Sequence, residues 1–439
     1  MCWILVCHQY ETSIAFSVNT FDFLRYQDPW LAQVFTNGWL SVDTFFFLGG
    51  LVLTRSLLPN LLASRCLSLI YFYLRRFLRL APSIALVAGF SATLLRLLSY
   101  GPQASLLQAY VDKCRAHWWK DLLFINNYIL GTDNILTLNN CLSQCWFTAV
   151  YMQLLLAMIL LLLLLLLLPI SCRKTAGMVV LVTATVAALV VPLVITLVYH
   201  LPPSQLPQLL SSEVSEYQRR MMLTPWCRAG PWVVGVWAAL LLHYTDSHNI
   251  NIPKCGVLTG YLVCTAVVMA LLGGLYPYNH VWPTRHYTRA VAASYGTLAR
   301  PSWALCMAWI VFTCHTHHAE VVNQLLSYAA WWPLSRLSFT VYLVGPVVQV
   351  WCASVQLTPV YFNYLSKLFE CLGVLFISTV LSLVLCCLLE RPISSLATAL
   401  LPYQGGVEGR SNLEAGNLLK TVESEPQHYD NQLISTTTT

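Results

Sequence analysis

Apolar stretches of about 20 residues recur along the chain, separated by short polar or charged segments. A helix of that length crosses the roughly 30 Å hydrocarbon core of a bilayer. The runs are too long and uniform for barrel strands, the other structure that satisfies backbone groups in lipid. We therefore expect an all-α, polytopic integral membrane protein, a bundle of about ten transmembrane helices. The expected spans are 2–18, 39–58, 76–98, 146–168, 177–199, 230–245, 256–275, 298–314, 333–352 and 366–389.

Composition supports one membrane domain. The 439 residues are 57% hydrophobic and 10% charged, whereas soluble domains are about 25% charged. The net charge of +6 comes from basic residues scattered at the ends of apolar segments, a pattern that does not indicate nucleic-acid binding. Lysine and arginine flank the short loops after even-numbered spans, so we expect these loops and the C-terminus in the cytoplasm. The long loops 100–145 and 200–227 are expected on the other side.

The two ends of the chain differ from the middle. Residues 396–439 are mostly polar and cannot bury enough apolar surface to fold alone, so we expect a disordered cytoplasmic tail. At the other end only about seven apolar residues precede His8, and Glu11 follows soon after. This pattern is typical of the second half of a span. We expect a transmembrane domain over 1–395 whose first span is truncated.

Most of the sixteen cysteines lie in apolar runs, where a thiol behaves as a small hydrophobe. Cys114, Cys141 and Cys145 instead lie in the long polar loop, and they can pair if that loop faces an oxidising compartment. The sequence leaves the partners open. The cluster Cys314–His318 resembles a metal site in composition only, without a second ligand pair at zinc spacing, and we expect no metal.

Two polar residues in the first two spans are candidates for chemistry. His8 is either an interfacial histidine or a general base, since a neutral imidazole can accept a proton from a hydroxyl near neutral pH. Asp43 is either a helix-start residue, stabilised by the helix dipole and by Ser41 or Thr44, or a carboxylate that orients a histidine on a neighbouring helix. The sequence alone does not separate these readings.

Arginines mark three further positions. Arg76 and Arg79 are three residues apart and share a face of the third span. They either set topology or bind a phosphate-bearing ligand that enters from the cytoplasm. Arg228 opens the sixth span and Glu390 closes the last, and both are interpreted as possible snorkelling terminal charges.

Seven stretches in a fixed order together resemble the acyltransferase 3 family of membrane proteins, in its nose resistant to fluoxetine branch. The resemblance covers about residues 1 to 395. The stretches are VDTFFFLGGLVL, RRFLR, CWFTAVYMQLLL, TPWCRAGPWVVG, ARPSWALCMAWIVFTC, PLSRLSFTVYLVGP and LERPI.

The resemblance implies a bundle of about ten helices that transfers an acyl group from cytoplasmic acyl-CoA, acetyl-CoA being the first choice, to a hydroxyl. His8 falls on the family's catalytic histidine and Asp43 on its Val-Asp-x-Phe-Phe aspartate. Arg76 and Arg79 match the arginine pair implicated in binding the acyl donor. The implied partners are membrane lipids, the acyl-CoA and an unidentified hydroxyl acceptor, in the plasma membrane or an internal membrane.

The sequence departs from the family in four places. The family's arginine about eleven residues before the histidine would precede Met1. Tyr151 stands where the family has aspartate, and Gly345 where it commonly has histidine. The branch's extra cysteine-rich extracellular domain is not present in this sequence. The alternatives to an acyltransferase are a multi-pass transporter of lipids or hydrophobic small molecules and an inactive family member. The oligomeric state is left open.

Overall fold

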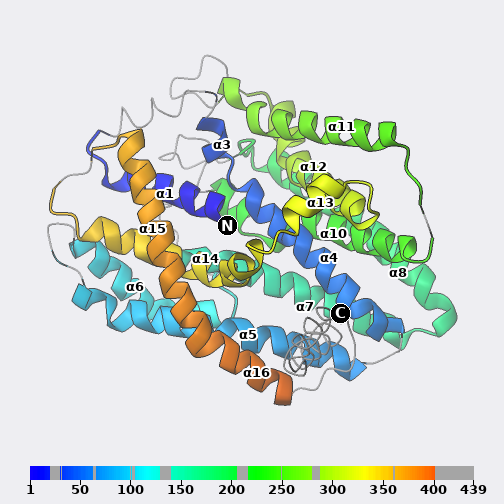
Figure 1. Ribbon diagram of the computed structural model, residues 1–439, viewed down its shortest axis with the longest axis horizontal. Coiled ribbons are helices and arrows are strands. Elements are labelled where there is room, and N and C mark those ends of the chain that lie inside the picture. The colour runs from blue at the N-terminus through cyan, green and yellow to red at the C-terminus, as the bar shows by residue number, and fades with distance from the viewer. Residues whose placement is uncertain are drawn as a thin grey trace, which may run out of the picture.

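All the regular structure in the described part of the chain is helical (Figure 1), which confirms the all-α membrane class. The computed structural model describes residues 1–19, 30, 32–62, 66–98, 100, 104–128, 140–204, 216–248, 250–278, 287–358 and 361–400.

The first half of the chain forms long helices over the predicted apolar runs. The leucine-rich helix α7 ends just before Pro169, where Arg173 donates hydrogen bonds to the carbonyls of Leu166 and Leu168 that the helix end leaves unpaired. The helices are α1 (Cys2–Phe16), α3 (Ala32–Thr36), α4 (Leu40–Leu62), α5 (Cys66–Thr93), η1 (Leu95–Leu98), α6 (Ala104–Leu122), η3 (Ser143–Cys145), α7 (Trp146–Leu167) and α8 (Ile170–Val198).

The second half continues in the same way. Two π-helical turns interrupt it, η4 (Gln218–Met222) before α10 and η6 (Cys386–Glu390) between α15 and α16. The remaining helices are α10 (Pro225–Thr245), α11 (Lys254–Gly273), η5 (Tyr276–Tyr278), α12 (Arg289–His315), α13 (Glu320–Leu326), α14 (Trp331–Ser354), α15 (Tyr364–Leu385) and α16 (Arg391–Leu400).

Each of the ten predicted spans overlaps one of these helices. Among the described residues, six helical segments are long and apolar enough to cross a membrane. They are Leu40–Leu58, Ser143–Leu167, Ile170–Val198, Lys254–Tyr278, Trp331–Ser354 and Leu365–Ala397. The membrane class is therefore confirmed, whereas the number of ten spans stays a prediction.

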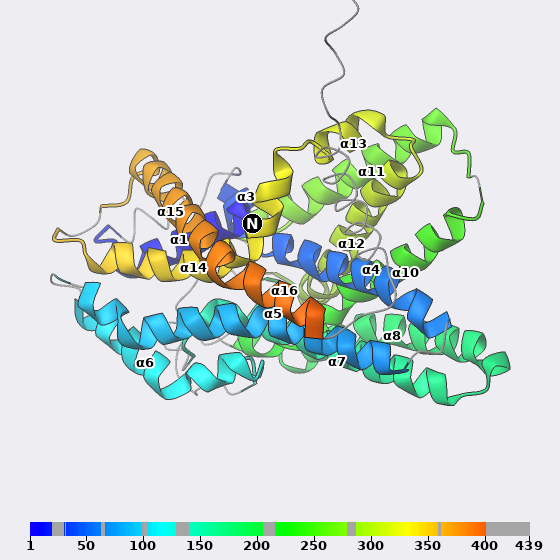
Figure 2. The same cartoon turned by 60° about the horizontal axis from the view of Figure 1, so that its bottom comes forward.

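Three boundaries differ from the sequence prediction. Helix α5 begins at Cys66, well before the expected start at 76, because the preceding residues are also apolar. Helix α6 lies in the segment 100–145, which the sequence predicts to be a long loop, and it packs along α5 (Figure 2). Helix α16 runs to Leu400, past the expected boundary at 395. The rest of the expected tail, 401–439, lies outside the described residues.

Loops that the sequence assigns to one side of the membrane contact each other. The Asp246 carboxylate, just after α10, pairs with Arg55 of α4 and with His315 at the end of α12, at 2.9 and 2.8 Å. At the opposite ends of the helices, the Trp351 indole donates to the carbonyl of Leu98. The alternation of the helices agrees with the predicted topology; which side faces the cytoplasm stays a prediction.

Helices α4 and α10 make the most extensive contact in the bundle. Their backbones approach closely at two glycines. A Cβ atom added at Gly235 of α10 would lie 2.2 Å from the Phe47 carbonyl oxygen of α4, and one added at Gly50 would lie 2.1 Å from that of Trp232. This seam fixes the N-terminal ends of α4 and α10 beside each other.

Candidate functional site

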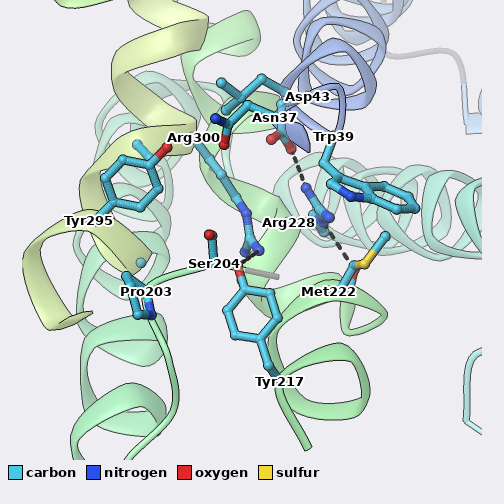
Figure 3. Close-up of a pocket in the computed structure, with 13 residues that line it drawn as sticks. Asn37, Trp39, Asp43, Pro203, Ser204, Tyr217, Met222, Arg228, Tyr295 and Arg300 are labelled. Carbon is cyan, nitrogen blue, oxygen red and sulfur yellow. Dashed lines mark hydrogen bonds and ion pairs between the residues drawn. The ribbon is translucent and has the colours of Figure 1, made fainter. Parts of the chain in front are cut away.

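A polar cavity lies between the N-terminal ends of α4 and α10 and the first half of α12 (Figure 3). Its volume is about 490 Å³, including the open mouth. The lining includes three charged side chains from three helices, together with aromatic rings and a serine. Those that matter for its chemistry are Trp39, Asp43, Ser204, Tyr217, Arg228 and Arg300.

Asp43 and Arg228 form a buried ion pair at this cavity. Asp43 lies in the first turn of α4 and Arg228 in the first turn of α10, and they are 1% and 2% exposed. Arg228 Nη1 donates to Asp43 Oδ1 at 2.7 Å, and Arg228 Nε donates to the carbonyl of Met222. Arg228 also lies over the Trp146 ring, 5.2 Å from its centroid. Removal of either partner would leave a buried charge without its counterion.

Arg300 of α12 brings a second guanidinium to the cavity. It is 7% exposed and donates hydrogen bonds to the carbonyls of Met221 and Cys227 and to the Tyr217 hydroxyl. Figure 3 shows Arg300 and Arg228 extending into the same space from different helices. All the acceptors of Arg300 are neutral at neutral pH, so the Asp43 carboxylate is the one anion among the residues that line this cavity.

His8 reaches this region through Trp39 rather than through Asp43. The His8 ring meets the Trp39 ring edge-on, with centroids 5.6 Å apart, and Trp39 lines the cavity. The bonded partner of the Asp43 carboxylate is Arg228, so the contact predicted between His8 and Asp43 is not formed. The structure thus places the two candidates in one neighbourhood without joining them. Their catalytic roles stay predictions.

A second, apolar cavity lies on another side of α4. It occupies about 380 Å³ between α1, α4, α7 and α14. Helix α4 therefore borders both cavities through its first turns, with Leu40 and Asp43 lining the polar one and Val42 and Phe45 lining the apolar one. The other lining residues are Met1, Ile4, Phe147, Ser338, Phe339 and Tyr342.

The arginine pair of α5 connects to the wall of the apolar cavity. Arg79, 44% exposed, forms an ion pair with Glu390 at 3.5 Å. Glu390 also accepts a hydrogen bond from Thr340 of α14, next to the cavity-lining Phe339. Arg76 lies over the Phe72 ring, 5.3 Å from its centroid. Because α5 begins at Cys66, the pair lies in the interior of a helix and not in its first turn.

Two sequence interpretations need correction. Arg228 and Glu390 are both buried and paired, so neither is a snorkelling terminal charge. Asp43 does lie at a helix start, but Ser41 and Thr44 do not satisfy it, because Ser41 donates to the carbonyl of Gly38 and Thr44 accepts from the Trp303 indole.

The cysteines of the long loop and the histidine cluster are also accounted for. A disulfide joins Cys114 of α6 to Cys141, and Cys145 is a free, buried thiol. In the cluster, His315 pairs with Asp246, and His318 accepts a hydrogen bond from the amide of Ile252. The absence of a metal from the protein stays a prediction.

Two positions that depart from the resembled family have apolar roles here. Tyr151 of α7 packs edge-on against Trp232 of α10, with centroids 5.6 Å apart. At Gly345 of α14, an added Cβ would lie 2.3 Å from the Leu5 side chain of α1. The glycine therefore leaves the room that Leu5 occupies, and a histidine at this position would require the Leu5 side chain to move.

Arg300 and Tyr217 are site residues that sequence reasoning did not identify. One signal was available for Arg300, because an arginine inside the predicted span 298–314 is expected to face a partner or a cavity. Tyr217 carried no such signal, since it lies in a polar loop next to charged residues.

Comparison with known proteins gives one informative match. The chain is 25% identical over 377 residues to Nose resistant to fluoxetine protein 6 of Caenorhabditis elegans. The aligned region covers 79% of this chain and 43% of that protein. The chain therefore spans less than half the length of this relative. The match supports the nose resistant to fluoxetine branch of the resemblance. No family model matches the chain, and no solved structure matches it.

Proposed function

We propose that this protein, a helical membrane protein related to the nose resistant to fluoxetine proteins, is an O-acyltransferase that uses acyl-CoA. One observation carries the proposal. The first turns of α4 border both an apolar cavity and a polar cavity, and His8 contacts Trp39 at that same end of α4. This arrangement suits an apolar acyl group and a polar acceptor that meet near one histidine.

The donor is proposed to bind between the arginine pair and α1. Arg76 and Arg79 suit its phosphates, because guanidinium groups bind phosphate oxygens in a bidentate manner. Glu390 connects Arg79 to α14, whose residues line the apolar cavity. Ile4 lines the same cavity and lies one helical turn before His8 on α1. An acyl group in this cavity would therefore lie close to the imidazole.

The chemistry assigned to His8 is general base catalysis. His8 accepts the proton of the acceptor hydroxyl while the hydroxyl oxygen attacks the thioester carbonyl carbon. The carbon–sulfur bond breaks, the ester forms, and His8 returns the proton to the departing CoA sulfur. Such assistance contributes about 10²–10⁴-fold to a rate. The assigned role of Asp43 is to hold Arg228 and shape the polar cavity, since its carboxylate pairs with that arginine.

The experiment is transfer of label from radioactive acetyl-CoA to membrane lipids or glycans by the purified protein. We expect His8→Ala to lose transfer by about 10²-fold or more while it remains folded. Arg79→Ala should raise the acetyl-CoA concentration needed for half-maximal rate. Arg96→Ala, at an exposed arginine of η1, is the matched control and should leave the rate unchanged. Full activity of His8→Ala would reject the proposed role.

A transporter of lipids or hydrophobic small molecules is the rival function, favoured by the polar cavity, since buried charges in membrane proteins also mark substrate pathways. The close backbone contacts at Gly50 and Gly235 argue against a path along the α4–α10 seam. Arg76→Ala separates the two functions, because an acyltransferase should lose acyl-CoA binding, whereas a transporter should lose substrate flux alone.

A further inference from the structure

Among the described residues that line it, the polar cavity carries one more positive than negative charge. Arg228 and Arg300 supply two guanidinium groups, and the carboxylate of Asp43 is already bonded to Arg228. No carboxylate of the described residues bonds Arg300, whose acceptors are two carbonyls and the Tyr217 hydroxyl. Burying a charge without a bonded counterion is unfavourable. An anion bound beside Arg300 would remove that cost.

Donors remain for such an anion. A guanidinium has five N–H groups, and Arg300 uses two on Nη1 and one on Nη2, which leaves Nε and one Nη2 hydrogen. Such N–H groups bind the oxygens of a carboxylate or phosphate. Ser204 lines the same cavity as Arg300 (Figure 3), so its hydroxyl can supply a further donor.

We propose that this cavity binds a singly charged oxyanion, a carboxylate or a phosphodiester, on the remaining N–H donors of Arg300. The excess charge of the cavity matches one negative charge. Asp43 limits the anion to that charge, because its carboxylate lies on the same cavity and repels a doubly charged group. The proposal does not depend on acyl transfer.

The test measures binding by the purified protein without acyl-CoA. One arm titrates hexanoate, a soluble carboxylate, into protein in uncharged detergent and follows the unfolding temperature and tryptophan fluorescence, because Trp39 lines the cavity. The other arm compares nanodiscs of phosphatidylglycerol with nanodiscs of phosphatidylcholine. Stabilisation by hexanoate identifies a soluble ligand, and stabilisation by phosphatidylglycerol alone identifies a lipid head group. Either result supports the site when it depends on Arg300.

We expect Arg300→Gln to weaken binding by about 10- to 100-fold, the loss expected for a hydrogen-bonded charge pair. Arg336→Gln is the matched control, because Arg336 is an exposed arginine that lies over the Trp332 ring outside the cavity. Should Arg300→Gln fail to fold, Ser204→Ala removes one donor without touching the ion pair and should weaken binding several-fold. A wild-type protein that responds to neither probe, or an Arg300→Gln or Ser204→Ala protein that binds like the wild type, would overturn the proposal.

Discussion

At the scale of single residues, the Asp43–Arg228 pair is the most deeply buried charge interaction among the ion pairs of the described residues. Its partners come from α4 and α10, 185 residues apart. A carboxylate in an apolar segment is costly in isolation, and Arg228 offsets that cost. The sequence indicated that Asp43 needed a partner but named His8 for it. His8 lies in α1 and Arg228 in the first turn of α10, and the packing of α4 on α10 brings Arg228 to the Asp43 carboxylate.

Asp43→Asn should therefore destabilise the protein strongly, by about 3–5 kcal/mol, because it leaves the Arg228 guanidinium buried without its counterion. The double change Asp43→Leu with Arg228→Met should be much less destabilising than the sum of the two single changes. Thermal unfolding in detergent measures both effects. Arg55→Met is the control, because it breaks the exposed pair with Asp246 and should cost at most about 1 kcal/mol. Additive effects of the two buried changes would contradict the pairing.

At the scale of helices, hydropathy located the predicted spans. It did not predict the helix that lies in the polar segment between the third and fourth spans. This segment, 100–145, contains α6, and its polar residues led to its interpretation as a loop. The helix is stabilised by contacts that are distant in sequence: packing on α5, the disulfide from Cys114 to Cys141, and hydrogen bonds to Asp121. Local pattern alone does not reveal such contacts. The same limit applies to Arg300, whose neighbours come from η4 and α10.

The α4–α10 seam predicts a glycine effect. Gly235→Ala should destabilise the protein, because its Cβ would lie 2.2 Å from the Phe47 carbonyl oxygen, and a backbone atom cannot move aside without shifting the helix. Gly373→Ala in α15 is the matched control, since no atom lies within 4 Å of the added Cβ. Thermal unfolding of both variants measures the difference. Equal unfolding temperatures would mean that the seam is not tightly packed.

Asp121 of α6 predicts a pH effect on stability. It accepts hydrogen bonds from the Leu142 amide and the Asn126 side chain, but burial outweighs them and raises its pKa to about 7. The unfolded chain releases this proton near pH 4. Between those values the folded state binds more protons, so the free energy of unfolding falls as pH rises, by about 1.4 kcal/mol per pH unit at most.

The unfolding temperature of wild-type protein should therefore be lower at pH 7 than at pH 5, and Asp121→Asn should reduce this difference. Asp112→Asn, at an exposed aspartate of the same helix, is the control and should behave like the wild type. A difference between the two pH values that is the same in Asp121→Asn and wild type would assign the effect to other groups.

At the scale of the whole molecule, α4 borders one cavity lined by three charged side chains and a second that is lined almost entirely by apolar ones, and the residues around them come from both halves of the chain. The apolar cavity is lined in part by α14, whose Thr340 donates a hydrogen bond to Glu390, and Glu390 in turn forms the ion pair with Arg79. The polar cavity lies on another face of α4 with its two arginines. The order of the motifs along the sequence suggested an acyltransferase. The division into an apolar and a polar compartment is the new reason, from the structure, to propose one.

The most direct test of this account is photolabelling of the purified protein with an acyl-CoA that carries a diazirine in its acyl chain, followed by mass spectrometry of the labelled peptides. The account predicts label on residues that line the apolar cavity, Ile4, Phe147 and Phe339 among them, and loss of this label with excess acetyl-CoA. Label confined to outward-facing residues of α8 or α11, unaffected by acetyl-CoA, would contradict the proposed donor site.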